Sequence, residues 1–67
     1  MKLKIGKATV RCGKEAYIFT IKARGEYPVV GLVRYDSCDE PCSWTSDGKF
    51  NKDKENLSAD IVSQEIS

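Results

Sequence analysis

The sequence predicts a small all-β protein with a strongly bent antiparallel sheet, either SH3-like or a partly closed barrel of five to six short strands. Apolar residues recur with a period of two along most of the chain, and turn-forming residues separate these segments at short intervals. No segment shows the 3.6-residue period of a long helix. The 67 residues form a single domain, residues 1–67. A core of this size is marginal, so a partner subunit, a metal or a disulfide often adds stability.

The first expected strand covers residues 7–12. Ala8, Val10 and Cys12 alternate there with polar residues, as a half-buried strand requires. Cys12 is therefore expected to be a small buried hydrophobic residue. Gly13 and Lys14 form the turn that follows.

The second expected strand covers residues 15–23, where β-branched and aromatic residues favour strand over helix. Its alternation divides the side chains between two faces. One face carries Tyr17, Phe19, Ile21 and Ala23, and the other carries Ala16, Ile18, Thr20 and Lys22.

Residues 27–35 form a third expected strand. Pro28 lacks an N–H group and belongs at the strand start or on an edge. Gly31 in the middle of this strand predicts a bulge or a sharp bend, which would curl the sheet. The acidic segment 36–41 is expected to be a loop.

Two short strands, residues 42–45 and 49–52, are expected to flank a hairpin turn at Asp47-Gly48. Asp-Gly is a strong hairpin signal because glycine readily adopts a positive φ angle. Residues 57–62 end the pattern as a last strand or as one helical turn capped by Ser58. We favour the strand because it would remove an exposed sheet edge.

The charges are segregated along the chain although the net charge is only +1. Residues 1–34 contain eight Lys/Arg and two Glu, a net charge of +6, and residues 35–67 contain three Lys and eight Asp/Glu, a net charge of −5. This asymmetry predicts a basic face that meets an anion, or two halves that pair within one chain or across a dimer.

Catalytic chemistry is not expected. The chain has no histidine, which removes the usual general base, and it has no glycine-rich phosphate loop. The three cysteines are an odd number, and without a signal peptide or an apolar membrane span they predict reduced thiols in a cytoplasmic protein. Cys38 and Cys42 are expected on a loop, where neighbouring acids would raise their pKa. A disulfide between them and a zinc site are the less favoured alternatives, and no cofactor is expected.

Aromatic rings and cations that lie close together in the sequence predict a binding site. Trp44 and Tyr35 would stack on a flat ring, while Arg34 and Arg24 would bind a phosphate or a carboxylate. Trp44 has an alternative role as a core residue, which the sequence leaves open. The candidate ligand-binding residues are Trp44, Tyr35, Arg34, Arg24, Lys49, Asp47 and Gly48.

Three segments together resemble a family of small, largely uncharacterised β-rich accessory proteins encoded by bacteriophages. They read YPVVGLV at residues 27–33, WTSDGKF at residues 44–50 and NLSADIV at residues 56–62. The last segment departs from the family's Leu-Asp-Leu-Val-like pattern. The resemblance implies a short β-rich accessory protein made in the cytoplasm of an infected host cell, and it implies no defined activity. A counter-defence role is an expectation by analogy with small phage proteins in general.

The leading functional hypothesis is a non-enzymatic homo-oligomer that binds or sequesters a small anionic, nucleotide-like ligand near its subunit interface. The alternative is a protein-interaction module that inhibits a host factor through its acidic surface. Single-stranded nucleic-acid binding is the third hypothesis. The acidic surface would consist of Asp36, Asp39, Glu40 and Asp47, and the nucleic-acid site of Lys7, Arg11, Lys22 and Arg24 with Tyr17 and Phe19 close by.

Overall fold

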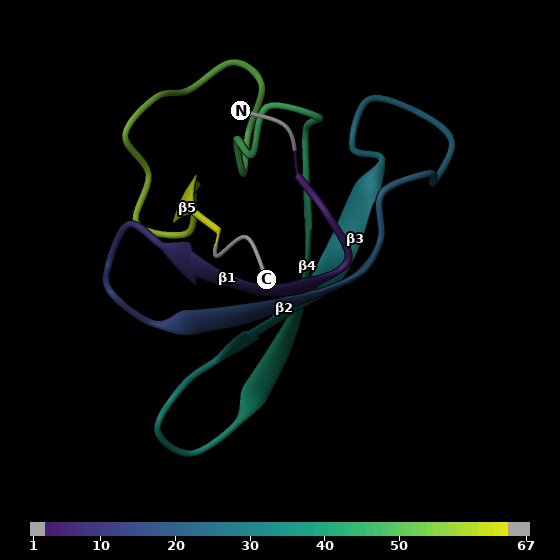
Figure 1. The fold of residues 1–67 in the computed structure, drawn as a ribbon. Helices are drawn as coiled ribbons and strands as arrows, with labels where there is room; N and C mark the ends of the chain where they lie inside the picture. Colours follow the sequence, from purple (N-terminus) through teal and green to yellow (C-terminus); the bar gives the residue numbers. More distant parts are fainter. Residues whose placement is uncertain (1–2, 65–67) are drawn as a thin grey trace.

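Five antiparallel strands form one open sheet in the computed structural model, which describes residues 3–64 (Figure 1). The strand order is β4-β3-β2-β1-β5, so the first four strands are a simple up-and-down series and the last returns beside the first. The strands are β1 (Gly6–Val10), β2 (Glu15–Thr20), β3 (Val29–Arg34), β4 (Asp39–Trp44) and β5 (Ile61–Ser63). The predicted small bent antiparallel sheet is confirmed, with five strands and an open edge.

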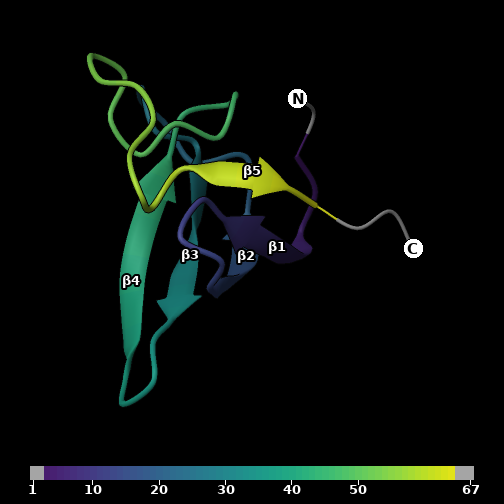
Figure 2. The ribbon, with the colours of Figure 1, turned by 90° about the vertical axis from the view of Figure 1, so that its left-hand side faces the viewer.

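The sheet bends at the β2–β3 pairing, where the sequence predicted a bulge at Gly31. The extra residue lies on the neighbouring strand, because Ile18 pairs with Gly31 and Thr20 with Val30, which leaves Phe19 without a partner. Gly31 permits the close approach of the two strands. A Cβ atom at this position would lie 1.9 Å from the backbone oxygen of Tyr17. Figure 2 shows the resulting curvature, with β5 crossing at one end of the sheet.

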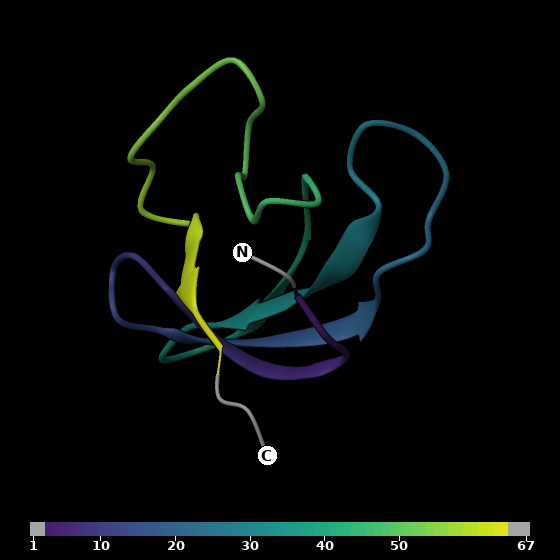
Figure 3. The ribbon, with the colours of Figure 1, turned by 45° about the horizontal axis from the view of Figure 1, so that its top comes forward.

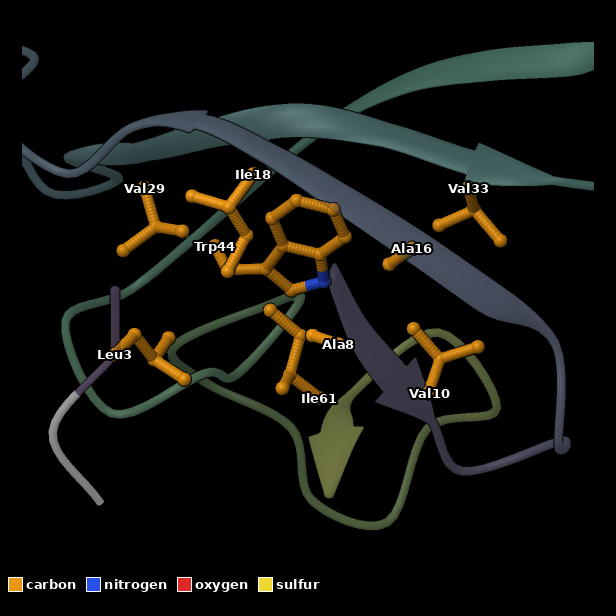
Figure 4. Packing of buried hydrophobic residues seen from close by; sticks show 9 residues of the cluster. All are labelled: Leu3, Ala8, Val10, Ala16, Ile18, Val29, Val33, Trp44 and Ile61. Carbon is orange, nitrogen blue, oxygen red and sulfur yellow. The ribbon is translucent and has the colours of Figure 1, made fainter. Parts of the chain in front are cut away.

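The inner face of the bent sheet holds the hydrophobic core (Figure 4). Trp44 is the largest fully buried side chain, and its indole N–H donates a hydrogen bond of 2.8 Å to the carbonyl of Ala59. The polar end of this ring is therefore satisfied inside the protein. The core consists of Leu3, Ala8, Val10, Ala16, Ile18, Val29, Val33, Trp44 and Ile61.

A long connection between β4 and β5, residues 45–60, covers the inner face (Figure 3). The buried carboxylate of Asp60 organises it by accepting hydrogen bonds from two backbone N–H groups, those of Phe50 at 2.8 Å and Leu57 at 3.0 Å. This connection contains no regular strand. Its buried backbone groups therefore need side-chain partners such as Asp60, because an unpaired buried N–H group would destabilise the fold.

The hairpin predicted around Asp47-Gly48 is only half correct. Gly48 does have a positive φ of 89°, and its N–H donates to the carbonyl of Thr45 at 2.9 Å. The second strand expected at residues 49–52 is wrong, because the chain turns away and the Phe50 N–H donates to Asp60 instead of to β4.

Two further expectations need correction. Residues 39–41 are not a loop, because they begin β4 and pair with residues 32–34 of β3. Cys12 is exposed and not buried, since β1 ends at Val10 and Cys12 lies in the turn after it.

In the final segment, the favoured strand is confirmed as β5, which pairs with β1. The alternative of a helical turn capped by Ser58 is wrong, because the residues before β5 form a non-helical turn in which the Asp60 N–H donates to the Leu57 carbonyl at 3.1 Å.

Edge strand β4 carries a proline that makes its free edge less able to pair with another strand. The Tyr35 N–H donates to the Cys38 carbonyl at 2.8 Å at the end of the β3–β4 hairpin. Antiparallel pairs alternate between hydrogen-bonded and non-hydrogen-bonded, so Leu32–Pro41 is a non-hydrogen-bonded pair. The ring nitrogen of Pro41 therefore points away from β3, and the edge lacks a donor at its centre.

Residues 3–64 form no helix, and so this part of the chain contains none that could cross a membrane.

Candidate binding surface

The structure does not assemble the predicted ligand site, and its central residue needs correction. The side chain of Trp44 has an exposed fraction of 0% and is enclosed by the core. A ligand cannot stack on this ring while the protein is folded, so Trp44 stabilises the fold and does not contact a ligand.

The other predicted site residues lie in separate regions. Tyr35 packs against the core at the start of the β3–β4 turn. Burial raises the pKa of its hydroxyl above the ordinary value, and the negative charge of the nearby Glu40 raises it further. Arg34 lies on the opposite, outer face of the sheet, and Arg24 is exposed in the connection between β2 and β3. The predicted aromatic and arginine partners therefore do not converge.

Lys49, Asp47 and Gly48 do lie together, in a shallow hollow beside the β4–β5 connection. The cations of this hollow already have partners. Lys49 lies 3.4 Å from Glu55, and Arg11 lies 3.9 Å from the buried Asp60. The hollow is lined by two cations and three carboxylates, so its net charge does not favour an anion.

Part of the charge segregation in the sequence is satisfied by ion pairs within one chain. Three ion pairs join a cation of residues 1–34 to an acid of residues 35–67. The shortest joins Lys14 to Asp36 at 2.9 Å, and it lowers the pKa of Asp36 and raises the pKa of Lys14. Of the two predicted uses of this asymmetry, pairing between the halves of one chain is confirmed.

The predicted acidic surface is divided by the same pairing. Asp36 and Asp39 each lie within 4 Å of a cation, at distances of 2.9 and 3.7 Å. Asp47 lies in the β4–β5 connection, away from the other three acids, of which Asp36 lies in the β3–β4 turn and Asp39 and Glu40 begin β4. These four carboxylates do not form a continuous acidic patch.

The three cysteines form no disulfide with one another. Cys12, Cys38 and Cys42 are free. Four residues of strand span about 13 Å, so Cys38 and Cys42 cannot be bridged along β4. Burial, and then the charge of Glu40, raises the pKa of the Cys42 thiol, which agrees with the predicted effect of neighbouring acids. Among residues 3–64, no three Cys, Asp or Glu side chains gather closely enough to hold a metal ion.

The outer face of the sheet carries the most unusual surface of the molecule. A sheet face in contact with water normally presents polar side chains. Here Tyr17 and Phe19 on β2 are 40% and 54% exposed, and their ring centroids lie 5.5 Å apart at an interplanar angle of 46°. Leu32 pairs with Tyr17 on the neighbouring strand and extends the apolar surface towards β4.

Charged side chains of both signs border these rings. Together the two kinds of residue line a groove of about 340 Å³. Its lining residues are Lys7, Glu15, Tyr17, Phe19, Leu32 and Arg34. We call this surface, with Asp39 at its border, the outer-face groove.

The ion pairs at the border of the outer-face groove are loose. Lys7 lies 3.9 Å from Glu15, and Arg34 lies 3.7 Å from Asp39, both longer than the roughly 2.7–2.9 Å of a strong charge-assisted hydrogen bond. All four side chains are more than 40% exposed. Exposed pairs of this kind contribute little to stability, so their charges remain able to bind a partner.

Sequence reasoning missed this groove as the principal site, although part of its signal was present. The alternation along β2 placed Tyr17 and Phe19 on one face and Ala16 and Ile18 on the other. The alternation separated these two faces, but it does not show which face is covered, because phenylalanine is buried about as often as aliphatic residues. Tyr17, Phe19 and Lys7 were instead predicted only as parts of the third hypothesis.

Comparisons of the chain with protein-family models, with curated proteins and with solved structures find no match. The resemblance to small bacteriophage proteins therefore stays a prediction.

Proposed function

We propose that this protein is a non-enzymatic interaction module that binds another protein surface through its outer-face groove. The observation that carries the proposal is the exposed Tyr17–Phe19 pair at the centre of an apolar sheet face. Contiguous exposed apolar surface on a soluble domain marks an interaction site, and aromatic residues are enriched at the centres of protein interfaces.

The composition of the groove supports a protein partner. Its centre is apolar, formed by Tyr17, Phe19 and Leu32, and its border is charged. This arrangement matches the apolar core and polar rim of protein interfaces. Of the four acids of the predicted acidic surface, only Asp39 borders the groove, so this proposal departs from the predicted acidic mimicry.

Site-specific photo-crosslinking tests the proposal in a lysate of the source cells. A photoreactive benzoylphenylalanine replaces Phe19, and in a matched control it replaces Phe50, which is also exposed (39%) but lies on the β4–β5 connection. We expect a covalent protein adduct at position 19 and none at position 50. Equal adducts at both positions, or no adduct at position 19 in a folded protein, would contradict the proposal.

A nucleotide-like ligand is a second candidate, because Lys7 and Arg34 flank the exposed rings. In this case Tyr17 and Phe19 would stack on the base, as was predicted for Trp44. Arg34 would leave its ion pair with Asp39 and bind the phosphate. Native mass spectrometry of protein purified from cells, before and after refolding, tests it. An additional mass of a few hundred daltons that is lost on refolding supports this candidate, and an identical bare mass in both samples contradicts tight binding.

A further inference from the structure

We propose that the partner of the outer-face groove is a second copy of this chain, bound face to face around a two-fold axis. This inference rests on the proposed function and names the partner. It follows from the charges of the groove, from the properties of the sheet edges and from the pairing of residues across the sheet.

The charges of the groove favour self-association over binding of a polyanion. Lys7 and Arg34 contribute two positive charges, and Glu15 and Asp39 contribute two negative charges. Their sum is zero, whereas affinity for nucleic acid depends on a net positive surface. A face with charge of one sign would repel a copy of itself, but a neutral face with both signs can be complementary to itself.

The edges of the sheet are poor sites for a second copy. Pro41 removes the central donor from the free edge of β4, as described above. The opposite edge strand, β5, has only three residues, so it offers few backbone groups for pairing. Face-to-face packing, with the two sheets about 10 Å apart, therefore provides the larger contact.

A two-fold axis that lies between the two faces and runs parallel to β2 and β3 predicts specific contacts. Such an axis keeps positions along the strands and reverses the order of the strands. The β1–β2 side of one copy then faces the β3–β4 side of the other. Since Ala16 pairs with Val33, Glu15 and Arg34 lie at equivalent positions on adjacent strands. Glu15 of one copy therefore faces Arg34 of the other, twice in the dimer and both times at the same level along the strands. The tyrosine and phenylalanine rings lie beside these contacts, further along β2.

The size of the molecule is compatible with this arrangement. An interface of standard size buries about 800 Å² on each partner. The chain exposes 4653 Å² in total and measures 30 × 28 × 19 Å, so a contact of this size requires one of its broad faces. A smaller contact over the groove alone would form a weaker, concentration-dependent dimer.

Charge reversal combined with sedimentation equilibrium tests the inference on the full chain. We expect the wild type to dimerise, and Arg34→Glu or Glu15→Arg alone to weaken dimerisation at least about tenfold because like charges then face each other. The double variant Glu15→Arg/Arg34→Glu should recover dimerisation. Lys52→Glu changes the net charge by the same amount as Arg34→Glu, lies outside the groove and should leave dimerisation unchanged.

Other outcomes separate this inference from the proposed function. A wild type that stays monomeric up to millimolar concentration, or a double variant that fails to recover while folded, would overturn the second copy as partner. A monomer that forms an adduct with a different protein at position 19 would keep the proposed function and overturn this inference. A dimer that is insensitive to both single reversals would place the interface elsewhere.

Discussion

The two faces of the same sheet differ in how fully their apolar side chains are buried and their polar groups are paired. On β2, Ile18 is fully buried in the core on the inner face, while the next residue, Phe19, is 54% exposed on the outer face. The inner face contains a buried carboxylate and an indole N–H, and both have hydrogen-bond partners. No buried side-chain nitrogen or oxygen atom among residues 3–64 lacks a partner.

This difference indicates separate roles for the two faces. The inner face is a complete core, so changes there should reduce stability without altering any surface. The outer face retains apolar area and loosely paired charges that the isolated chain does not use. Substitutions on one face at a time therefore test whether stability and binding can be separated.

The largest effect is expected for Trp44→Ala on the inner face. Removing a fully buried indole leaves a cavity and an unpaired carbonyl at Ala59, at a cost of about 3–5 kcal/mol in the free energy of unfolding. This is comparable with the whole stability expected of such a small domain, so the variant should be largely unfolded. Urea unfolding followed by circular dichroism measures the change.

Phe50→Ala is the control for this substitution, because Phe50 is an aromatic residue with 39% exposure. Its loss should reduce stability much less than the loss of Trp44. A Trp44→Ala variant with wild-type stability would mean that the indole is not part of the core.

A smaller loss of stability is expected for Asp60→Ala. The carboxylate accepts hydrogen bonds from the backbone N–H groups of Phe50 and Leu57, and both would lose a buried acceptor. Such losses cost about 1–3 kcal/mol. Hydrogen exchange should show faster exchange of these two amides with little change in β2 and β3. Uniform acceleration across the sheet would instead show that the connection and the sheet unfold as one unit.

The smallest effect is expected at the exposed Lys14–Asp36 pair. Its hydrogen bond and charge lower the pKa of Asp36 in the folded protein. A lowered folded-state pKa contributes stability above the pKa of the unfolded state, and that contribution is lost as the pH falls through the folded-state pKa. In Lys14→Gln, the titration midpoint of the Asp36 carboxyl carbon in NMR spectra should rise. An unchanged midpoint would mean that the two side chains do not interact in solution.

Much of the fold could be predicted because it depends on local patterns. The period of two fixed the existence of β1, β2 and β3, and the position of Gly31 located the bend. The β4 boundaries were missed because Pro41 and the acids suggest a loop, and only the pairing with β3 shows that a proline fits this edge. The role of Asp60 depends on contacts with residues up to ten positions away, which no local pattern reveals.

The candidate site was harder to predict because exposure depends on tertiary structure. Trp44 and Phe19 are both aromatic residues on short strands, and nothing in their immediate sequence shows which one is covered. The long connection after β4 decides this, since it covers the inner face and encloses Trp44. The arginines and aromatic residues near residue 34 were close in sequence, but strand alternation placed Arg34 and the core on opposite faces.

The most direct test of the division between the two faces is the substitution Phe19→Thr, which keeps a β-forming residue on the outer face. Sedimentation equilibrium and urea unfolding would be measured on the variant and the wild type. We expect the free energy of monomer unfolding to fall by no more than about 1.5 kcal/mol through loss of the Tyr17–Phe19 contact, while dimerisation weakens about tenfold or more. A variant that loses stability by more than about 2 kcal/mol, or that dimerises as the wild type does, would contradict the assignment of the outer face to binding.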